Sequence, residues 1–144
     1  MNNKKLREGL KIRKAVLGEE FVNRAFAEAD EFSRPFQELV TEYCWGTVWR
    51  RPGLPRKIRS LINLAMLTAL NRPHELRLHL RGALHNGCTK EEILETLLQT
   101  AIYCGVAAAS DSFRVAREFF EEINKISRHT APGGRRSITK ARGI

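Results

Sequence analysis

Apolar residues recur three and four positions apart along almost the whole chain, which is the period of an amphipathic α-helix. No stretch alternates between apolar and polar residues as a half-buried strand does. The pattern therefore predicts an all-α domain without internal repeats. The expected helices span residues 3–16, 19–30, 33–45, 55–71, 74–87, 89–104 and about 108–126.

Residues that favour helix ends lie between the predicted helices or at their ends. Thr89 and Glu92 have the spacing of a capping box, in which each side chain bonds the backbone N–H of the other residue. Asn86-Gly87 is a natural left-handed stop. The other expected boundaries are Gly18, Ser33 followed by Pro35, Pro52-Gly53 and Gly105.

The segment 55–71 differs from the others. In RSLINLAMLTALN the apolar residues lie almost all the way round a helix instead of on one face. A helix that is apolar all round is typical of the inside of a fold. We therefore expect this helix to be the buried centre of the domain.

The composition is that of a globular protein with one domain. The chain has 144 residues, of which 42% are hydrophobic and 28% charged, enough to form a core. The first residues, MNNKKLREGL, are too polar for a secretory signal, and no apolar run has the length of a membrane span. Cys44, Cys88 and Cys104 are odd in number and form no CxxC, so neither a disulfide framework nor a zinc site is expected. These features predict a reduced, cytoplasmic protein.

The net charge of +9 is concentrated at the C-terminal end. Residues 127–144 hold five basic and no acidic side chains, which leaves 20 basic and 16 acidic residues, a net charge of +4, in the rest of the chain. This segment is rich in glycine and too poor in apolar residues to pack a core. We expect a disordered, solvated tail or a cloning remnant after a domain formed by residues 1–126, and no nucleic-acid partner.

The strongest candidate for acid–base chemistry lies on the helix 74–87. At 100° per residue, Glu75, His79, Gly82 and Asn86 lie within about 40° of one another at the edge of the apolar stripe, and Arg72 joins them if the helix begins early. A carboxylate four residues before an imidazole can orient the ring and raise its basicity. The alternative is an ordinary ion pair on the helix surface. A mid-helix glycine costs about 1 kcal/mol against alanine, so Gly82 indicates the close approach of another group.

Other candidate chemistry has less support. His85 points to a different side of the helix from Glu75 and His79, so the three are not expected to bind a metal. The cysteines have no base beside them in the sequence, although Cys44 could meet His79 in the folded chain. Tyr103 is expected to be a buried hydrogen-bonding tyrosine rather than a catalytic acid.

Residues 43–54 read YCWGTVWRRPGL and hold both tryptophans of the chain. Trp45 and Trp49 lie on one face if the helix continues past Gly46, either as core or interface residues or as walls of a binding site. Arginine is the preferred bidentate partner of carboxylate and phosphate groups. Positive charge close to the tryptophans comes from Arg50, Arg51 and Arg59. The residues alone thus predict an anion site and name no substrate.

The same residues resemble the carboxymuconolactone decarboxylase family. The likeness is carried by YCWGxxWxRPGL and ELxxHxxGAxxNG, extends from about residue 8 to about residue 122, and leaves out the basic tail. Two such motifs in one chain are far more specific than a lone glycine motif. They resemble the decarboxylase branch itself, not only the wider superfamily.

The resemblance implies an all-helical, alkylhydroperoxidase D-like fold, assembled as a homo-oligomer such as a trimer or hexamer. The disulfide reductases that share this fold use a CxxC pair followed by a histidine. Here Arg72 and Glu75 stand at the two cysteine positions and His79 keeps the histidine, so dithiol peroxidase chemistry is not expected there. The family often reads YCGVP, and this chain has Ala107 where the proline stands.

The resemblance also implies a reaction, the decarboxylation of 4-carboxymuconolactone to 3-oxoadipate enol-lactone in the catabolism of aromatic compounds by the β-ketoadipate pathway. The electrons of the broken C–C bond pass through the ring alkene into the lactone carbonyl, so neither a metal nor an organic cofactor is expected. The implied roles are a proton donor, His79, oriented by Glu75; carboxylate ligands, Arg51 and Arg59; ring walls, Trp45 or Trp49; and an oxyanion donor, Tyr103.

Rival functions remain open. One is a thiol-dependent peroxidase that works through Cys44 or Cys104. Another is a helical interaction module that uses the tryptophans as interface anchors and the basic tail to bind an acidic partner. A third is the decarboxylation of a related lactone or β-keto acid.

Overall fold

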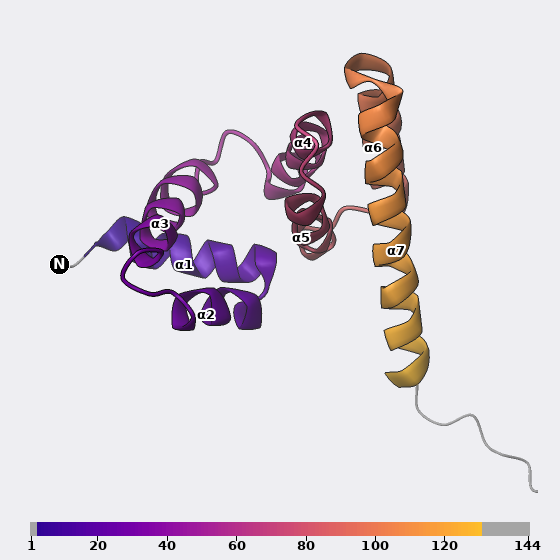
Figure 1. The fold of residues 1–144 in the computed structure, drawn as a ribbon. Coiled ribbons are helices and arrows are strands. Elements are labelled where there is room, and N and C mark those ends of the chain that lie inside the picture. Colours follow the sequence, from indigo (N-terminus) through magenta and orange to yellow (C-terminus); the bar gives the residue numbers. More distant parts are fainter. Residues whose placement is uncertain (1–2, 131–144) are drawn as a thin grey trace, which may run out of the picture.

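The computed structural model describes residues 3–130, which form seven α-helices and one π-helix and contain no β-strand (Figure 1). The predicted all-α fold is confirmed. In chain order the elements are α1 (Lys4–Leu17), α2 (Glu19–Ala27), α3 (Arg34–Leu39), the π-helix η1 (Val40–Val48), α4 (Arg56–Ala69), α5 (Pro73–His85), α6 (Lys90–Cys104) and α7 (Val106–Thr130).

Most helix ends lie within a few residues of their predicted positions. The capping box of α6 is confirmed, because the backbone N–H of Glu92 donates to Thr89 Oγ1 at 3.1 Å and that of Thr89 donates to Glu92 Oε2 at 2.8 Å. Gly105, with φ of 109°, separates α6 from α7 in a conformation that favours glycine. α7 is longer than expected and continues to Thr130. The rest of the predicted tail, residues 131–144, lies outside the described residues.

The helix expected from Ser33 to Trp45 changes character on the way. α3 ends at Leu39, and the chain continues as η1. The wider turns of a π-helix are evident where the backbone N–H of Trp49 donates to the carbonyl oxygen of Cys44, five residues earlier, at 2.9 Å. The helical path therefore passes Gly46 without interruption.

α5 lies in the middle of the fold, with α1–α3 on one side and α6 and α7 on the other (Figure 1). It packs against α1 as well as against α4 and α7. Leu76, Leu80 and Ala83 belong to the core that α5 shares with α4, α6 and α7. Leu78 packs against a second core, which α1, α2 and η1 build. α5 therefore joins two separate clusters of apolar side chains.

The expectation that residues 55–71 form the buried centre is wrong. Neighbouring helices cover only one face of α4, on which Ser60, Leu64 and Thr68 are buried. The apolar residues of another face are between 39% and 69% exposed, namely Ile58, Ile62, Met66 and Leu70. α4 is therefore apolar all round because it carries both a buried face and an exposed apolar stripe. Exposed apolar stripes of this kind are typical of protein–protein interfaces. The homo-oligomer stays a prediction.

α1 and η1 cross with their backbones in contact. A methyl group added to Gly9 would lie 2.1 Å from the carbonyl oxygen of Thr41. A methyl group added to Gly46 would lie 2.2 Å from the carbonyl oxygen of Lys5. Arg13 is buried beside this crossing and donates from Nη1 to Thr41 Oγ1 at 2.9 Å. Neither glycine can carry a side chain unless the two helices move apart.

Gly9→Ala should lower the free energy of unfolding by about 2 kcal/mol or more, because the added methyl group overlaps backbone atoms. Gly53→Ala is the matched control: no heavy atom lies within 4 Å of its added methyl group, and a change within about 0.5 kcal/mol is expected. Urea denaturation of both variants and the parent protein measures the difference. Parental stability of Gly9→Ala would show that α1 and η1 can separate there at little cost.

Candidate active site

Three aromatic rings from two helices stack in a row. The ring centroids of Trp45 in η1 and Trp49, the C-cap residue that follows it, lie 4.7 Å apart with 25° between the planes. The ring of His79 on α5 follows, with its centroid 6.3 Å from that of Trp45 and the planes 4° apart. Both indoles are buried and the imidazole is half-buried. The sequence predicted that the two indoles share one face if the helix continues past Gly46, and η1 does continue through Gly46.

Asn63 on α4 is a second neighbour of the His79 ring, and sequence reasoning missed it. Its Nδ2 lies 3.4 Å from Nδ1 of His79. A signal was present, because Asn63 is a polar residue inside the apolar run of α4, one turn after Arg59. This residue marks the part of α4 that faces α5.

Burial sets the charge state of His79. It lowers the pKa of the imidazole from 6.5 to about 4, and the negative charge of Glu75 opposes this shift only in part. The ring is therefore neutral at pH 7. Glu75 is exposed, and its influence on the ring is that of a charge one turn away, whereas Asn63 supplies the contact to a ring nitrogen.

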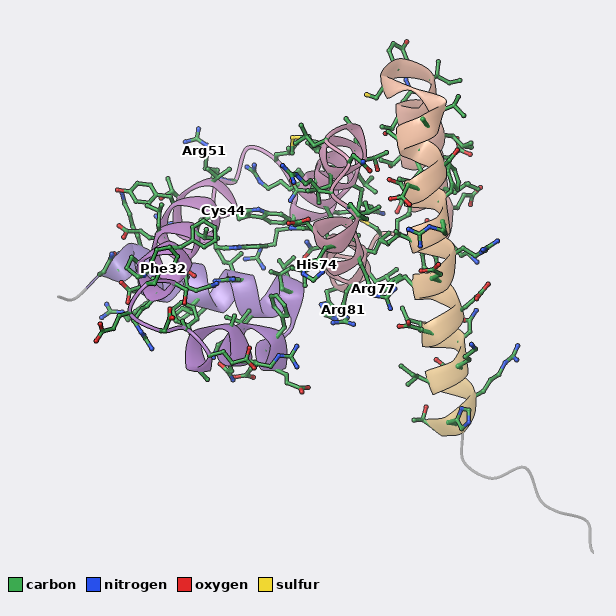
Figure 2. The ribbon with its side chains drawn as sticks, in the orientation of Figure 1. Phe32, Cys44, Arg51, His74, Arg77 and Arg81 are labelled. Atoms are coloured by element: carbon green, nitrogen blue, oxygen red, sulfur yellow. The ribbon has the colours of Figure 1, made fainter. Side chains whose placement is uncertain are left out.

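Arg59 lies one turn before Asn63 on α4 and is half-buried. Its Nη2 donates to the carbonyl oxygen of Arg51 at 3.3 Å. Its Nε–H is enclosed and has no partner among the described residues. An enclosed donor without an acceptor costs about 1–3 kcal/mol, which an arriving anion can recover. Arg51 differs, because its side chain is exposed and points away from the helices (Figure 2).

Other residues expected near His79 lie elsewhere. The expectation of a buried Tyr103 is wrong, since this side chain is 80% exposed at the end of α6, on the opposite side of α4 and α5 from η1 (Figure 1). Arg72 precedes the first turn of α5 and is exposed. The close approach indicated by Gly82 is confirmed, but it comes from α1: a methyl group on Gly82 would lie 3.0 Å from Cγ1 of Val16.

Two of the cysteines, Cys44 and Cys88, have thiols whose pKa is raised. Burial raises the pKa of the half-buried Cys44 thiol, although the charge of Arg13 and a hydrogen bond from Trp49 oppose the shift. Burial also raises the pKa of Cys88. Cys104 is exposed, and all three thiols are free. A raised thiol pKa disfavours the nucleophilic form that a thiol peroxidase needs.

His85 faces α1, away from His79, as the helix geometry predicted. Its Nδ1–H donates to the carbonyl oxygen of Val16 at 2.6 Å. Within residues 3–130 no three His, Cys, Asp or Glu side chains are grouped so that they could hold a metal ion. In the same part of the chain no helix is both long and apolar enough to cross a membrane.

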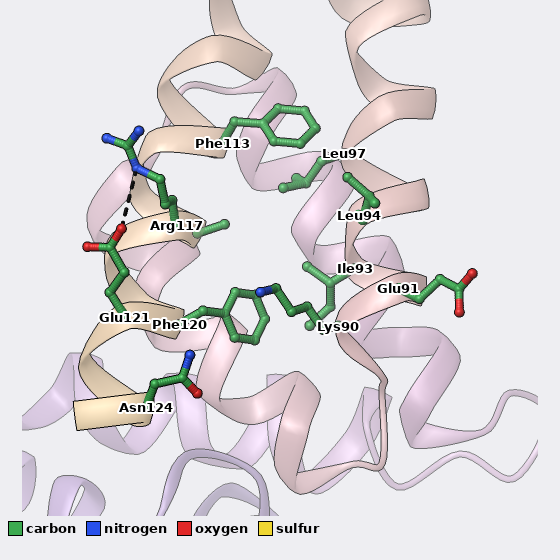
Figure 3. A pocket seen from close by; sticks show the side chains of 11 residues that line it. Lys90, Glu91, Ile93, Leu94, Leu97, Phe113, Arg117, Phe120, Glu121 and Asn124 are labelled. Atoms are coloured by element: carbon green, nitrogen blue, oxygen red, sulfur yellow. Dashed lines mark ion pairs between the residues drawn. The ribbon is translucent and has the colours of Figure 1, made fainter. Parts of the chain in front are cut away.

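A groove of about 610 Å³ lies between α6 and α7, away from this cluster (Figure 3). Its cations already have partners: Arg117 lies 3.9 Å from Glu121, and Lys90 lies 5.0 Å from the ring centre of Phe120. The lining holds no histidine, cysteine or tyrosine. Because its charged side chains are paired or at the rim and it brings no imidazole or aromatic stack together with a free cation, we take as the candidate site the rings of His79, Trp45 and Trp49 with Asn63 and Arg59, the His79 cluster.

His79→Gln should remove a pH-dependent part of the stability. The unfolded chain takes up a proton on this imidazole near pH 6.5, whereas the folded chain does so only near pH 4, so acidification between these values favours unfolding. Between about pH 7.5 and about pH 5 the parent protein should lose up to about 2 kcal/mol more unfolding free energy than the variant. Urea denaturation at both pH values measures this. The same pH dependence in both proteins would contradict a neutral, half-buried ring.

Comparison with known proteins agrees with the resemblance seen in the motifs. Residues 34–118 match the carboxymuconolactone decarboxylase family. The chain is 41% identical to the 4-carboxymuconolactone decarboxylase of Acinetobacter baylyi over 122 residues, which cover 85% of this chain and 91% of the relative. It is 47% identical to a nitrosuccinic acid decarboxylase of Metarhizium robertsii over 116 residues, 81% of each chain. The chain belongs to the carboxymuconolactone decarboxylase family.

Proposed function

We propose that the chain is a carboxy-lyase that converts 4-carboxymuconolactone to 3-oxoadipate enol-lactone and CO2. The likeness to the Acinetobacter baylyi enzyme over 91% of that relative carries the substrate assignment. The His79 cluster supports the chemistry, because it combines a half-buried imidazole, two buried indoles and an arginine whose Nε–H has no partner among the described residues.

The reaction requires from the protein only stabilisation of negative charge and the delivery of one proton. Loss of CO2 from the γ-carbon of the lactone leaves an electron pair that moves through the ring alkene into the lactone carbonyl. The resulting dienolate is protonated at its α-carbon. The site must hold the remaining carboxylate, stabilise the enolate oxygen and deliver the proton.

We assign the proton to His79 and the retained carboxylate to Arg59. The ring is neutral in the empty site, and a bound dianion raises the pKa of a neighbouring imidazole because it favours the charged form. The ring then takes up a proton from solvent as the dianion binds, and it delivers a proton to the α-carbon. The buried indole of Trp45 lies parallel to the imidazole and fixes the plane of its ring.

Arg51 and Tyr103 have weaker support within one chain. Arg51 is exposed and directed into solvent, so we give it a secondary part in attracting the dianion. Tyr103 is exposed at the end of α6. As an oxyanion donor it could act only in a site completed by a second copy of the chain, and this role stays a prediction.

The proposal is tested by giving the purified protein 4-carboxymuconolactone and following CO2 release and enol-lactone formation. His79→Gln should lower kcat by about 10²- to 10⁴-fold, the usual contribution of a general acid. Arg59→Ala should raise KM by about 10-fold or more, since it removes a charge-assisted hydrogen bond, and Arg51→Ala should raise it less.

Arg117→Ala is the matched control for these arginine variants, because it removes the same charge in the groove between α6 and α7 and should leave kcat and KM unchanged. Near-normal turnover by His79→Gln would remove His79 from the reaction. Absence of turnover in folded parent protein would refute the substrate assignment.

A second substrate is favoured by the likeness to the nitrosuccinic acid decarboxylase, which has the higher of the two identities. Nitrosuccinate is also a dicarboxylate, and one carboxylate is attached to the carbon that bears the nitro group. On loss of CO2 the electron pair moves into the nitro group as a nitronate, and the carbon is then protonated. Both reactions need a site that binds the remaining carboxylate, stabilises the developing negative charge and delivers one proton.

Comparing kcat/KM for the two substrates decides between them. We expect kcat/KM for 4-carboxymuconolactone to exceed that for nitrosuccinate by about tenfold or more, because a flat ring can lie against the half-buried imidazole of His79, whereas an open-chain dicarboxylate makes less contact with it. The opposite ratio would assign the chain to nitrosuccinate. Turnover of neither substrate, with peroxide-dependent oxidation of the thiols, would favour the thiol peroxidase instead.

A further inference from the structure

We propose that Asn63 is a positioning residue that holds His79 in the tautomer protonated at Nε2, so that Nε2 is the atom that delivers the proton. The catalytic part of this inference rests on the proposed function. The tautomer itself is a property of the protein without substrate and can be measured separately.

The geometry of one contact carries the proposal. Nδ2 of Asn63 lies 3.4 Å from Nδ1 of His79, between the packed helices α4 and α5. An amide nitrogen only donates, so the ring nitrogen that it faces must be the acceptor. A neutral imidazole that accepts at Nδ1 carries its hydrogen on Nε2. The distance is at the long end for a hydrogen bond, as is common for catalytic groups before substrate binds.

The other neighbours of the ring do not distinguish its two nitrogens. Trp45 from η1 lies parallel to the imidazole and meets its face, not its edge. Glu75, one turn earlier on α5, contributes the charge that acts on the ring, and Asn63 and Trp45 are uncharged. Nε2 has no hydrogen-bond partner among the described residues. Asn63 therefore decides that the hydrogen stays on Nε2, and this Nε2–H is left free to contact a ligand.

An amide suits this task better than a carboxylate. A carboxylate at position 63 would accept a hydrogen bond, move the hydrogen to Nδ1 and favour the charged imidazolium. The amide keeps the ring neutral and the N–H at Nε2. When an anionic ligand arrives, the added proton binds Nδ1 and the Asn63 amide turns its Oδ1 toward that nitrogen, so the charged ring still offers its Nε2–H to the ligand.

The test is ¹⁵N NMR of the His79 imidazole in the full chain without substrate, with the signals assigned by their loss in His79→Gln. The parent protein at neutral pH should show Nδ1 as the bare nitrogen and Nε2 as the N–H. Asn63→Leu should give a mixture of tautomers. Asn63→Asp should move the hydrogen to Nδ1 and raise the midpoint of the His79 titration.

Asn124→Asp is the matched control. It makes the same chemical change in the groove between α6 and α7 and should leave the His79 signals unchanged. An N–H at Nδ1 in the parent protein would overturn the proposal without any variant. An unaltered tautomer in a folded Asn63→Leu protein would overturn it as well.

Turnover tests the catalytic part. Asn63→Leu should lower kcat by about 10- to 100-fold, a share of what a general acid contributes, with KM changed less than about twofold. A tautomer shift with normal kcat would remove Asn63 from catalysis. If the parent protein turns over neither 4-carboxymuconolactone nor nitrosuccinate, the proposed function fails, and the NMR result still decides the tautomer.

Discussion

Because Gly9 and Gly46 carry no side chains, α1 and η1 cross with backbone against backbone, and this contact places the π-helix where its Trp45 stacks on His79 of α5. Gly82 acts in the same way on the other side of α1, where it lets α5 approach Val16. α1 thus holds η1 and α5 in a fixed relation through glycines on both neighbours. The stack of rings forms in the space between them, so the position of the imidazole depends on residues that take no part in chemistry.

Local signals in the sequence predicted the helices well, because they depend on residues close together in the chain. The capping box of Thr89 and Glu92 and the stop at Gly105 are examples. The burial of α4 was predicted wrongly, since the pattern shows which faces are apolar but not how many faces one chain can cover. The π-helix had no signal that we recognised in the sequence, and its close crossing with α1 is a contact between residues far apart in the chain.

The candidate site was predictable only in part, because some of its residues are recognisable locally and others only through contacts between helices. His79, Trp45, Trp49 and Arg59 stood out because their chemistry is unusual for the helices that carry them. Asn63 was missed because an asparagine in an apolar helix gains meaning only when its neighbour on the next helix is known. The sequence could not rank Arg51 and Arg59 either, since the difference between a solvated and a half-enclosed guanidinium arises from packing.

Both tryptophans of the chain belong to the stack beside His79. All indole fluorescence of this protein therefore originates within the candidate site, with no background from elsewhere in the chain. The parallel imidazole lies against that fluorophore pair, so a change of charge on the ring alters the electric field at the emitting group. The protein therefore carries an intrinsic optical probe of the His79 cluster, and this probe needs neither a label nor a coupled reaction.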